Sequence, residues 1–147
     1  MASRQRGSET LYAADSNGNF TTTCQGHPLT LSFLDSGSNG LFFDDNSIRP
    51  CTLSVGFYCP MATSNLSATN ASFNGARSGT LNFTVENVDG LGPAIVAASI
   101  GGSYSGASSV TTNGSFDWGL PFFFGRRVFV ALEGSASAGG PDPYWAY

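Results

Sequence analysis

The stretch that most constrains the fold of this chain is residues 31–43. An apolar run at residues 31–34 leads directly into the carboxylate of Asp35, five turn-forming residues follow, and a second apolar run begins at Leu41. Serine, glycine and asparagine favour tight turns, because they tolerate unusual backbone angles or hydrogen-bond to nearby backbone groups. The pattern therefore predicts a buried strand that ends at Asp35, a tight turn, and a second buried strand.

The rest of the chain predicts an all-β fold with one or two short helices. The 147 residues include 19 glycines, 7 prolines and 12 phenylalanines, and only 11% are charged, which is typical of a loop-rich β protein with an aromatic core. Asn-Gly pairs at 17–18 and 74–75 predict hairpins that join strands 11–14 to 19–24 and 66–73 to 80–88. The candidates for helical structure are residues 44–48, 93–100 and 121–126.

The length predicts a single domain over residues 11–147, since a chain of this size can bury a hydrophobic core. Residues 1–10 are polar and lack the apolar segment of a signal peptide, so we expect a disordered lead-in or a remnant of cloning. We expect the parent protein to be extracellular or periplasmic.

Charge excludes some partners. The net charge of −4 and the single adjacent basic pair, Arg126 and Arg127, argue against nucleic acid, because no basic patch is available to neutralise phosphates. No window holds 18 consecutive apolar residues, so we expect no membrane span.

The three cysteines predict one disulfide bond. Cys51 and Cys59 flank a short loop that contains glycine, where a disulfide would suit an oxidising compartment; two buried free thiols are the alternative. Cys24 is expected to be a small buried apolar residue. With one histidine and no Cys-x-x-Cys pair, we expect neither a metal nor a cofactor.

The Asp35 stretch resembles the Asp-Thr/Ser-Gly-Ser/Thr signature of pepsin-like and retropepsin-like aspartic peptidases. The resemblance assigns the catalytic carboxylate to Asp35, the close backbone approach to Gly37, and the orienting hydroxyls to Ser36 and Ser38. In those peptidases two carboxylates share one proton and activate water, because two like charges about 3 Å apart cannot both ionise.

A later block, Phe-Asp-Trp-Gly at residues 116–119, resembles the segment that threads the aspartate loop in such lobes, with Trp118 and Gly119 as its end. The resemblance covers roughly residues 12–147 and is closest to a C-terminal lobe. Two departures stand out: Asp117 occupies a position where the family has an apolar residue, and Leu120 one where aspartate is common. The chain carries the Asp-Ser-Gly motif once.

The chain also resembles the C-terminal half of an uncharacterised bacterial family of exported proteins of unknown function, whose members end in similar Trp-Gly-Leu-Pro-Phe-Phe and Pro-Tyr-Trp-Ala-Tyr patterns.

Three functions compete. In the first, Asp35 is half of a peptidase dyad that acts on a polypeptide and is completed by a second lobe or a homodimer copy. In the second and third, the domain binds a ligand without catalysis, or Asp35 closes the turn of an exported structural domain. Phe57 and Tyr58 are the candidates for a substrate cover; the alternative is an aromatic surface hairpin.

Overall fold

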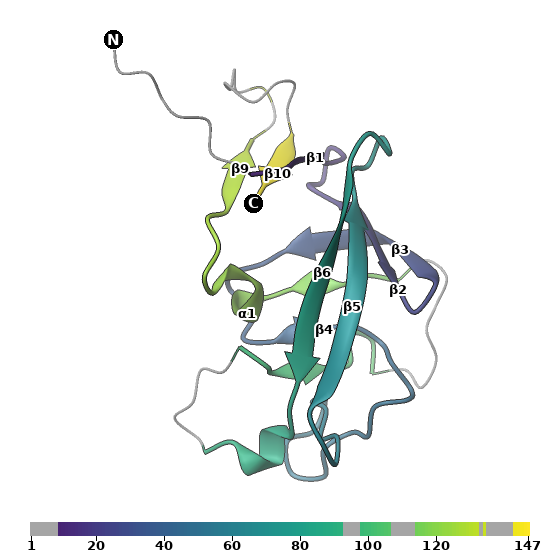
Figure 1. Ribbon diagram of the computed structural model, residues 1–147, viewed down its shortest axis with the longest axis vertical. Coiled ribbons are helices and arrows are strands. Elements are labelled where there is room, and N and C mark those ends of the chain that lie inside the picture. Colours follow the sequence, from purple (N-terminus) through teal and green to yellow (C-terminus); the bar gives the residue numbers. More distant parts are fainter. Residues whose placement is uncertain (1–8, 93–97, 107–113, 133, 135–142) are drawn as a thin grey trace.

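The computed structural model describes residues 9–92, 98–106, 114–132, 134 and 143–147 (Figure 1). Strands make up nearly all of the regular structure in these residues, as the sequence predicted. In chain order the elements are β1 (Leu11–Ala13), β2 (Phe20–Cys24), β3 (His27–Leu34), β4 (Leu41–Phe42), β5 (Ser64–Ala71), β6 (Ser78–Val85), the 3-10 helix η1 (Val88–Gly90), β7 (Gly101–Gly102), β8 (Asp117–Trp118), α1 (Leu120–Phe123), β9 (Phe129–Ala131) and β10 (Tyr144–Ala146).

Seven strands form one sheet in the order β6-β5-β2-β3-β8-β4-β7. Short turns set its two hairpins. Gln25 and Gly26, with φ of 50° and 78°, join β2 to β3, and Gly75, with φ of 71°, lies in the turn between β5 and β6. Glycine adopts positive φ at no steric cost. The predicted hairpin around Asn74 and Gly75 is therefore confirmed.

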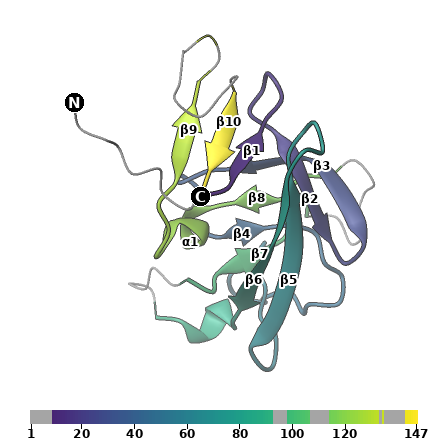
Figure 2. The ribbon, with the colours of Figure 1, turned by 45° about the horizontal axis from the view of Figure 1, so that its top comes forward.

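The hydrophobic core lies between the long β5–β6 hairpin and the strands β3, β8 and β4, which the hairpin crosses in both views (Figures 1 and 2). Phe83 of β6 meets the rings of Phe116 and Trp118 edge-on, at centroid distances of 5.7 and 5.5 Å. Phe116 and Trp118 stack on each other at 4.0 Å. Large aromatic surfaces removed from water in this way supply much of the stabilisation of a small β domain.

A second sheet, in the order β1-β10-β9, brings the first and last described strands together. Thr10 and Tyr147 exchange two backbone hydrogen bonds, of 2.9 and 3.3 Å, so the paired region already includes Thr10, which we had expected in the lead-in. Residues 1–8 lie outside the described residues. The predicted pairing of strands 11–14 and 19–24 is wrong: β1 pairs with β10, although the turn at Asp15 is present.

Helical structure is short. α1 begins one residue before the predicted helical segment 121–126 and ends at Phe123. The helix predicted at residues 44–48 is absent, and residues 46–48 form a turn. Of the predicted helix 93–100, residues 93–97 lie outside the described residues and Ala98 and Ser99 form a turn. Within the described part of the chain, no helix has the length and apolar character needed to cross a membrane.

Candidate functional site

Asp35 follows the last residue of β3 and opens a tight turn. Its carbonyl accepts the backbone N–H of Ser38 at 3.2 Å, and its Oδ1 accepts the backbone N–H of Gly37 at 2.8 Å. Its Oδ2 lies 3.1 Å from Ser38 Oγ. The carboxylate is half-buried, while Ser36 and Gly37 are exposed. The turn therefore presents an oriented carboxylate at the protein surface.

The strand β8 lies between β3 and β4, parallel to the first and antiparallel to the second (Figure 2). Asp35 N–H donates to the carbonyl of Trp118 at 3.1 Å, and Leu120 N–H donates to the carbonyl of Ser38 at 2.7 Å. A Cβ on Gly119 would lie 2.0 Å from the Gly40 carbonyl oxygen. Only glycine fits there, so the backbone of residues 116–119 is locked beneath the turn.

The insertion of β8 brings a second carboxylate to the turn. Asp117 Oδ2 lies 2.5 Å from Ser38 Oγ, so one hydroxyl stands between the carboxylates of Asp35 and Asp117. Asp117 is only 6% exposed, and its Oδ1 is buried with no hydrogen-bond partner among the described residues. In register, Phe33 of β3 and Phe42 of β4 are its neighbours on the two sides.

Burial is the main reason why the pKa of Asp117 is raised above its ordinary value of 3.8, because a charge is poorly solvated there. The hydrogen bond from Ser38 lowers this pKa, and the negative charge of Asp35 raises it. A buried carboxyl with a raised pKa beside a second carboxyl is an arrangement found at functional sites more often than elsewhere.

The two residues predicted to cover a substrate, Phe57 and Tyr58, differ in burial. Tyr58 is buried, and its hydroxyl donates to the carbonyl of Phe43 at 2.5 Å and accepts the N–H of Asp45 at 2.9 Å. Phe57 packs on Phe42, with ring centroids 5.6 Å apart. Tyr58 therefore serves the core, and of the two residues only Phe57 is partly exposed.

The disulfide between Cys51 and Cys59 is confirmed, and Cys24 is free and buried. Asp89 closes the loop between the two half-cystines by accepting backbone N–H groups of residues 52–54, at 2.9 to 3.3 Å. Although both sulfurs lie close to a carboxylate oxygen of Asp89, the S–S bond occupies them, so this group is no metal site. A disulfide is typical of oxidising compartments.

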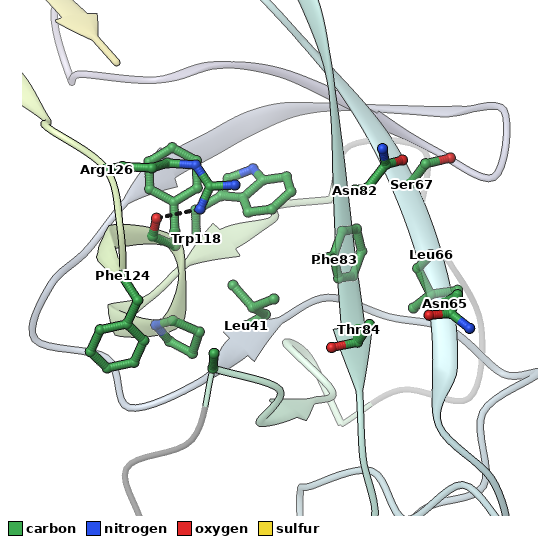
Figure 3. Close-up of a pocket in the computed structure, with 13 residues that line it drawn as sticks. Leu41, Asn65, Leu66, Ser67, Asn82, Phe83, Thr84, Trp118, Phe124 and Arg126 are labelled. Atoms are coloured by element: carbon green, nitrogen blue, oxygen red, sulfur yellow. Dashed lines mark hydrogen bonds between the residues drawn. The ribbon is translucent and has the colours of Figure 1, made fainter.

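A pocket of about 520 Å³ opens between the β5–β6 hairpin and α1 (Figure 3). Leu41, Phe83 and Trp118 contribute apolar surface, and Arg126 lies at the rim, where its guanidinium donates to the Phe122 carbonyl at 2.6 Å. Successive residues of a strand face opposite sides of a sheet. The pocket, on the Trp118 side of β8, is therefore on the other face from Asp117.

Sequence reasoning named Asp35, Ser38 and Gly119 but gave Asp117 no role. The available signal was the charge itself, because an aspartate stood where the resemblance required an apolar side chain. The structure brings Asp35, Ser38 and Asp117 together, whereas Phe57 contacts Phe42 and Tyr58 contacts Phe43.

Comparison with known proteins gives one match. A family model described as a protein of unknown function, DUF3443, matches residues 3–147. No curated protein and no solved structure matches the chain. The likeness to aspartic peptidases thus remains a prediction from the motifs. Because the family model covers nearly the whole sequence, the chain belongs to the DUF3443 family of proteins of unknown function.

Proposed function

We propose that this chain is one lobe of an exported aspartic-peptidase-like protein, in which residues 11–147 act as a single domain and Asp35 supplies one of two carboxylates that activate water for peptide hydrolysis. The observation that carries this proposal is the Asp35 turn: an oriented, half-buried carboxylate held by Gly37 N–H and Ser38 Oγ at the end of a central strand. The order β3-β8-β4 and the lock at Gly119 support the resemblance on which the proposal rests.

The chemistry requires a second carboxylate that faces the same water molecule as Asp35. One member of such a pair is ionised and removes a proton from water, while the other is protonated and donates to the substrate carbonyl oxygen. Asp117 is not suited to that role, because Ser38 Oγ stands between it and Asp35 and its own carboxyl is buried. The second carboxylate must therefore come from another lobe or another copy.

A second copy meets this need by symmetry. In an isologous dimer the same residues of both chains meet at the twofold axis, so two Asp35 carboxylates can lie about 3 Å apart there. The proposed substrate is a polypeptide, and no cofactor takes part in the reaction. An isolated monomer should have no turnover.

One observation favours a second candidate function. The pocket beside Trp118 and Arg126 lies across the sheet from the Asp35 turn, so a ligand could bind there without any contribution from Asp35. On this alternative the chain is a non-catalytic binding domain.

The test compares two aspartates that close similar turns. We would measure cleavage of an unfolded protein substrate from acidic to neutral pH, together with the solution mass, for the wild type, Asp35→Asn and Asp15→Asn. Asp35→Asn should lower kcat by about 10²-fold or more, as for loss of a general acid–base, and a transition-state analogue of the aspartic class should block the wild type. Asp15→Asn should leave kcat unchanged.

Acid cleavage should follow the dimer fraction, or appear only when a second lobe is present. Cleavage that persists in Asp35→Asn, or that a strictly monomeric preparation performs, would overturn the proposal. Ligand binding that depends on Arg126 while no assembly cleaves the substrate would favour the binding domain instead.

A further inference from the structure

We propose that Asp117 is a positioning residue. Its neutral carboxyl donates to Ser38, and the Ser38 hydroxyl is thereby oriented to donate a hydrogen bond to Asp35. The role of Asp35 in this inference rests on the proposed function. The state of Asp117 can be measured without catalysis.

A count of hydrogens leads to this assignment. Asp35 Oδ2, Ser38 Oγ and Asp117 Oδ2 form a row with contacts of 3.1 and 2.5 Å, and each contact needs one hydrogen. Ser38 supplies one hydrogen only. If both carboxylates were ionised, one contact would bring two lone pairs together. One additional proton satisfies both contacts.

The environment decides which carboxyl holds that proton. Asp35 is half-buried and accepts Gly37 N–H in addition to its contact with Ser38, so it has water and donors to stabilise a charge. Asp117 is buried, and its Oδ1 has no partner among the described residues. A buried charge without donors is costly. The proton therefore belongs on Asp117 Oδ2, where it donates to Ser38 Oγ, and the Ser38 hydroxyl donates to Asp35 Oδ2.

Among the described residues, the charge that acts on Asp117 is negative and does not reverse this order. The neighbours in register are the aromatic side chains of Phe33 and Phe42, and Asp35 is the charged group that acts on Asp117 among the described residues. Residues 107–113 contain no titratable side chain. Burial first, and then the charge of Asp35, raises the pKa of Asp117 against the opposing effect of the Ser38 hydrogen bond.

The arrangement has a use in the proposed reaction. A carboxylate that removes a proton from water must keep a fixed orientation while its charge changes. With Asp117 neutral, Ser38 is restricted to donating toward Asp35. Asp117 thereby preorganises Asp35 without contact with substrate.

The decisive measurement is a pH titration of the full chain with 13C-labelled aspartate carboxyl groups, followed by NMR. The Asp117 resonance should keep the position of a neutral acid at pH values where Asp15 is already ionised. In Asp35→Asn the midpoint of Asp117 should move to lower pH, because the neighbouring negative charge is gone. The infrared band of a protonated carboxyl should be present in the wild type at the same pH and absent in Asp117→Asn.

The wild-type titration requires no variant, so a variant that fails to fold leaves the inference testable. An Asp117 that ionises together with Asp15 would overturn it, as would a midpoint that does not respond to Asp35→Asn. In an active assembly, Asp117→Leu should lower kcat about tenfold, the equivalent of one hydrogen bond to a charged group, and Asp117→Asn, whose amide still donates to Ser38, should restore it. Failure of the peptidase assay alone would leave the titration result unaffected.

Discussion

The turns at Asp15 and Asp35 are built in nearly the same way. Each begins with Asp-Ser, and in each the aspartate carbonyl accepts the N–H three residues later, from Gly18 at 2.9 Å and from Ser38 at 3.2 Å. In each, Oδ1 accepts the N–H two residues later at 2.8 Å. Aspartate closes turns in this way throughout proteins. An Asp-Ser turn therefore marks no site by itself, and within this chain Asp15 is the natural control.

The two turns differ in what the second carboxylate oxygen meets. Asp15 Oδ2 accepts from the side chain of Asn19 at 3.2 Å, so its contacts end within the turn. Asp35 Oδ2 meets Ser38 Oγ, which reaches Asp117, a residue 79 positions later in the chain than Ser38. The distinguishing property of the Asp35 turn is therefore a long-range connection to a second acid.

The pKa values of Asp15 and Asp117 are shifted in opposite directions. Burial opposes the charge of Asp15, but hydrogen bonds from Asn19 and Asn17 outweigh it, and the pKa of Asp15 is lowered from 3.8. The pKa of Asp117 is raised by burial and by the like charge of Asp35, against the effect of its single donor, Ser38. One turn thus favours a charge, and the other site favours a proton.

The largest difference should appear between Gly119, which lies against the Asp35 turn, and Gly18, which lies in the Asp15 turn. In Gly119→Ala the new Cβ would meet backbone oxygens of Gly40 and Ser38, at 2.0 and 2.8 Å, which cannot move without displacing the turn, so we expect a loss of about 3 kcal/mol in the free energy of unfolding. In Gly18→Ala nothing lies within 4 Å, and only the positive φ of 85° is strained, at about 1 kcal/mol. Urea unfolding followed by tryptophan fluorescence measures both. Equal losses would contradict the lock at Gly119.

Reduction of the disulfide separates a global loss of stability from a local change at the site. Removing the link between Cys51 and Cys59 should cost about 2–3 kcal/mol through the entropy of the unfolded chain, yet it should leave the titration of Asp117 unchanged. Unfolded, unreduced protein should show one free thiol, that of Cys24. A count of three thiols would contradict the disulfide. A shifted Asp117 midpoint after reduction would show that the disulfide affects the site and not only the global stability.

Two serines of the same turn provide a matched pair. Ser38→Ala leaves Asp117 Oδ2 buried without its partner and should cost about 2 kcal/mol. Ser36 is exposed, so Ser36→Ala should change the free energy of unfolding by less than about 0.5 kcal/mol. Thermal unfolding at neutral and acidic pH is the measurement. If Ser36→Ala costs as much as Ser38→Ala, the connection to Asp117 contributes nothing to the turn.

The smallest expected effect is in the pH dependence of the free energy of unfolding, which should have opposite signs in Asp15→Asn and Asp117→Asn. A lowered folded pKa contributes stability above the unfolded value and loses it as the pH falls through the folded pKa, so Asp15→Asn should be most harmful at neutral pH. A raised folded pKa contributes stability below the unfolded value and loses it as the pH rises through the folded pKa, so Asp117→Asn, whose amide still donates to Ser38, should be nearly neutral in acid and stabilising at pH 7. Unfolding free energies measured from about pH 3 to pH 7 test both signs. Parallel curves for the two variants would show that the carboxyls have similar environments.

The features that the sequence predicted depend on local chemistry. The Asn74-Gly75 hairpin and the turn at Asp35 are encoded by adjacent residues whose backbone preferences are known. The loop closed by Cys51 and Cys59 was predictable for the same reason.

Long-range register could not be predicted in this way. Residues 11–14 carry an apolar pattern that fits pairing with β2 as well as with β10. In the structure β1 pairs with β10, and Tyr12 stacks on Tyr147 with ring centroids 4.8 Å apart. The contact of Ser38 with Asp117 likewise requires β8 to align with β3 at one register, Phe33 beside Asp117. A shift of one residue would place Asp117 in the core and Trp118 outside.

The position of β8 between β3 and β4 has a consequence for how the chain folds. Both neighbours are complete before residue 43, yet the strand that joins them is Asp117–Trp118. During synthesis β3 and β4 keep unpaired backbone groups on the edges that face β8 until residues 117 and 118 have been made. Pairing over such a sequence separation is slow and exposes strand edges to aggregation. We therefore expect the Asp35 site to form late in folding, and a truncated chain that ends before residue 117 lacks the strand that completes it.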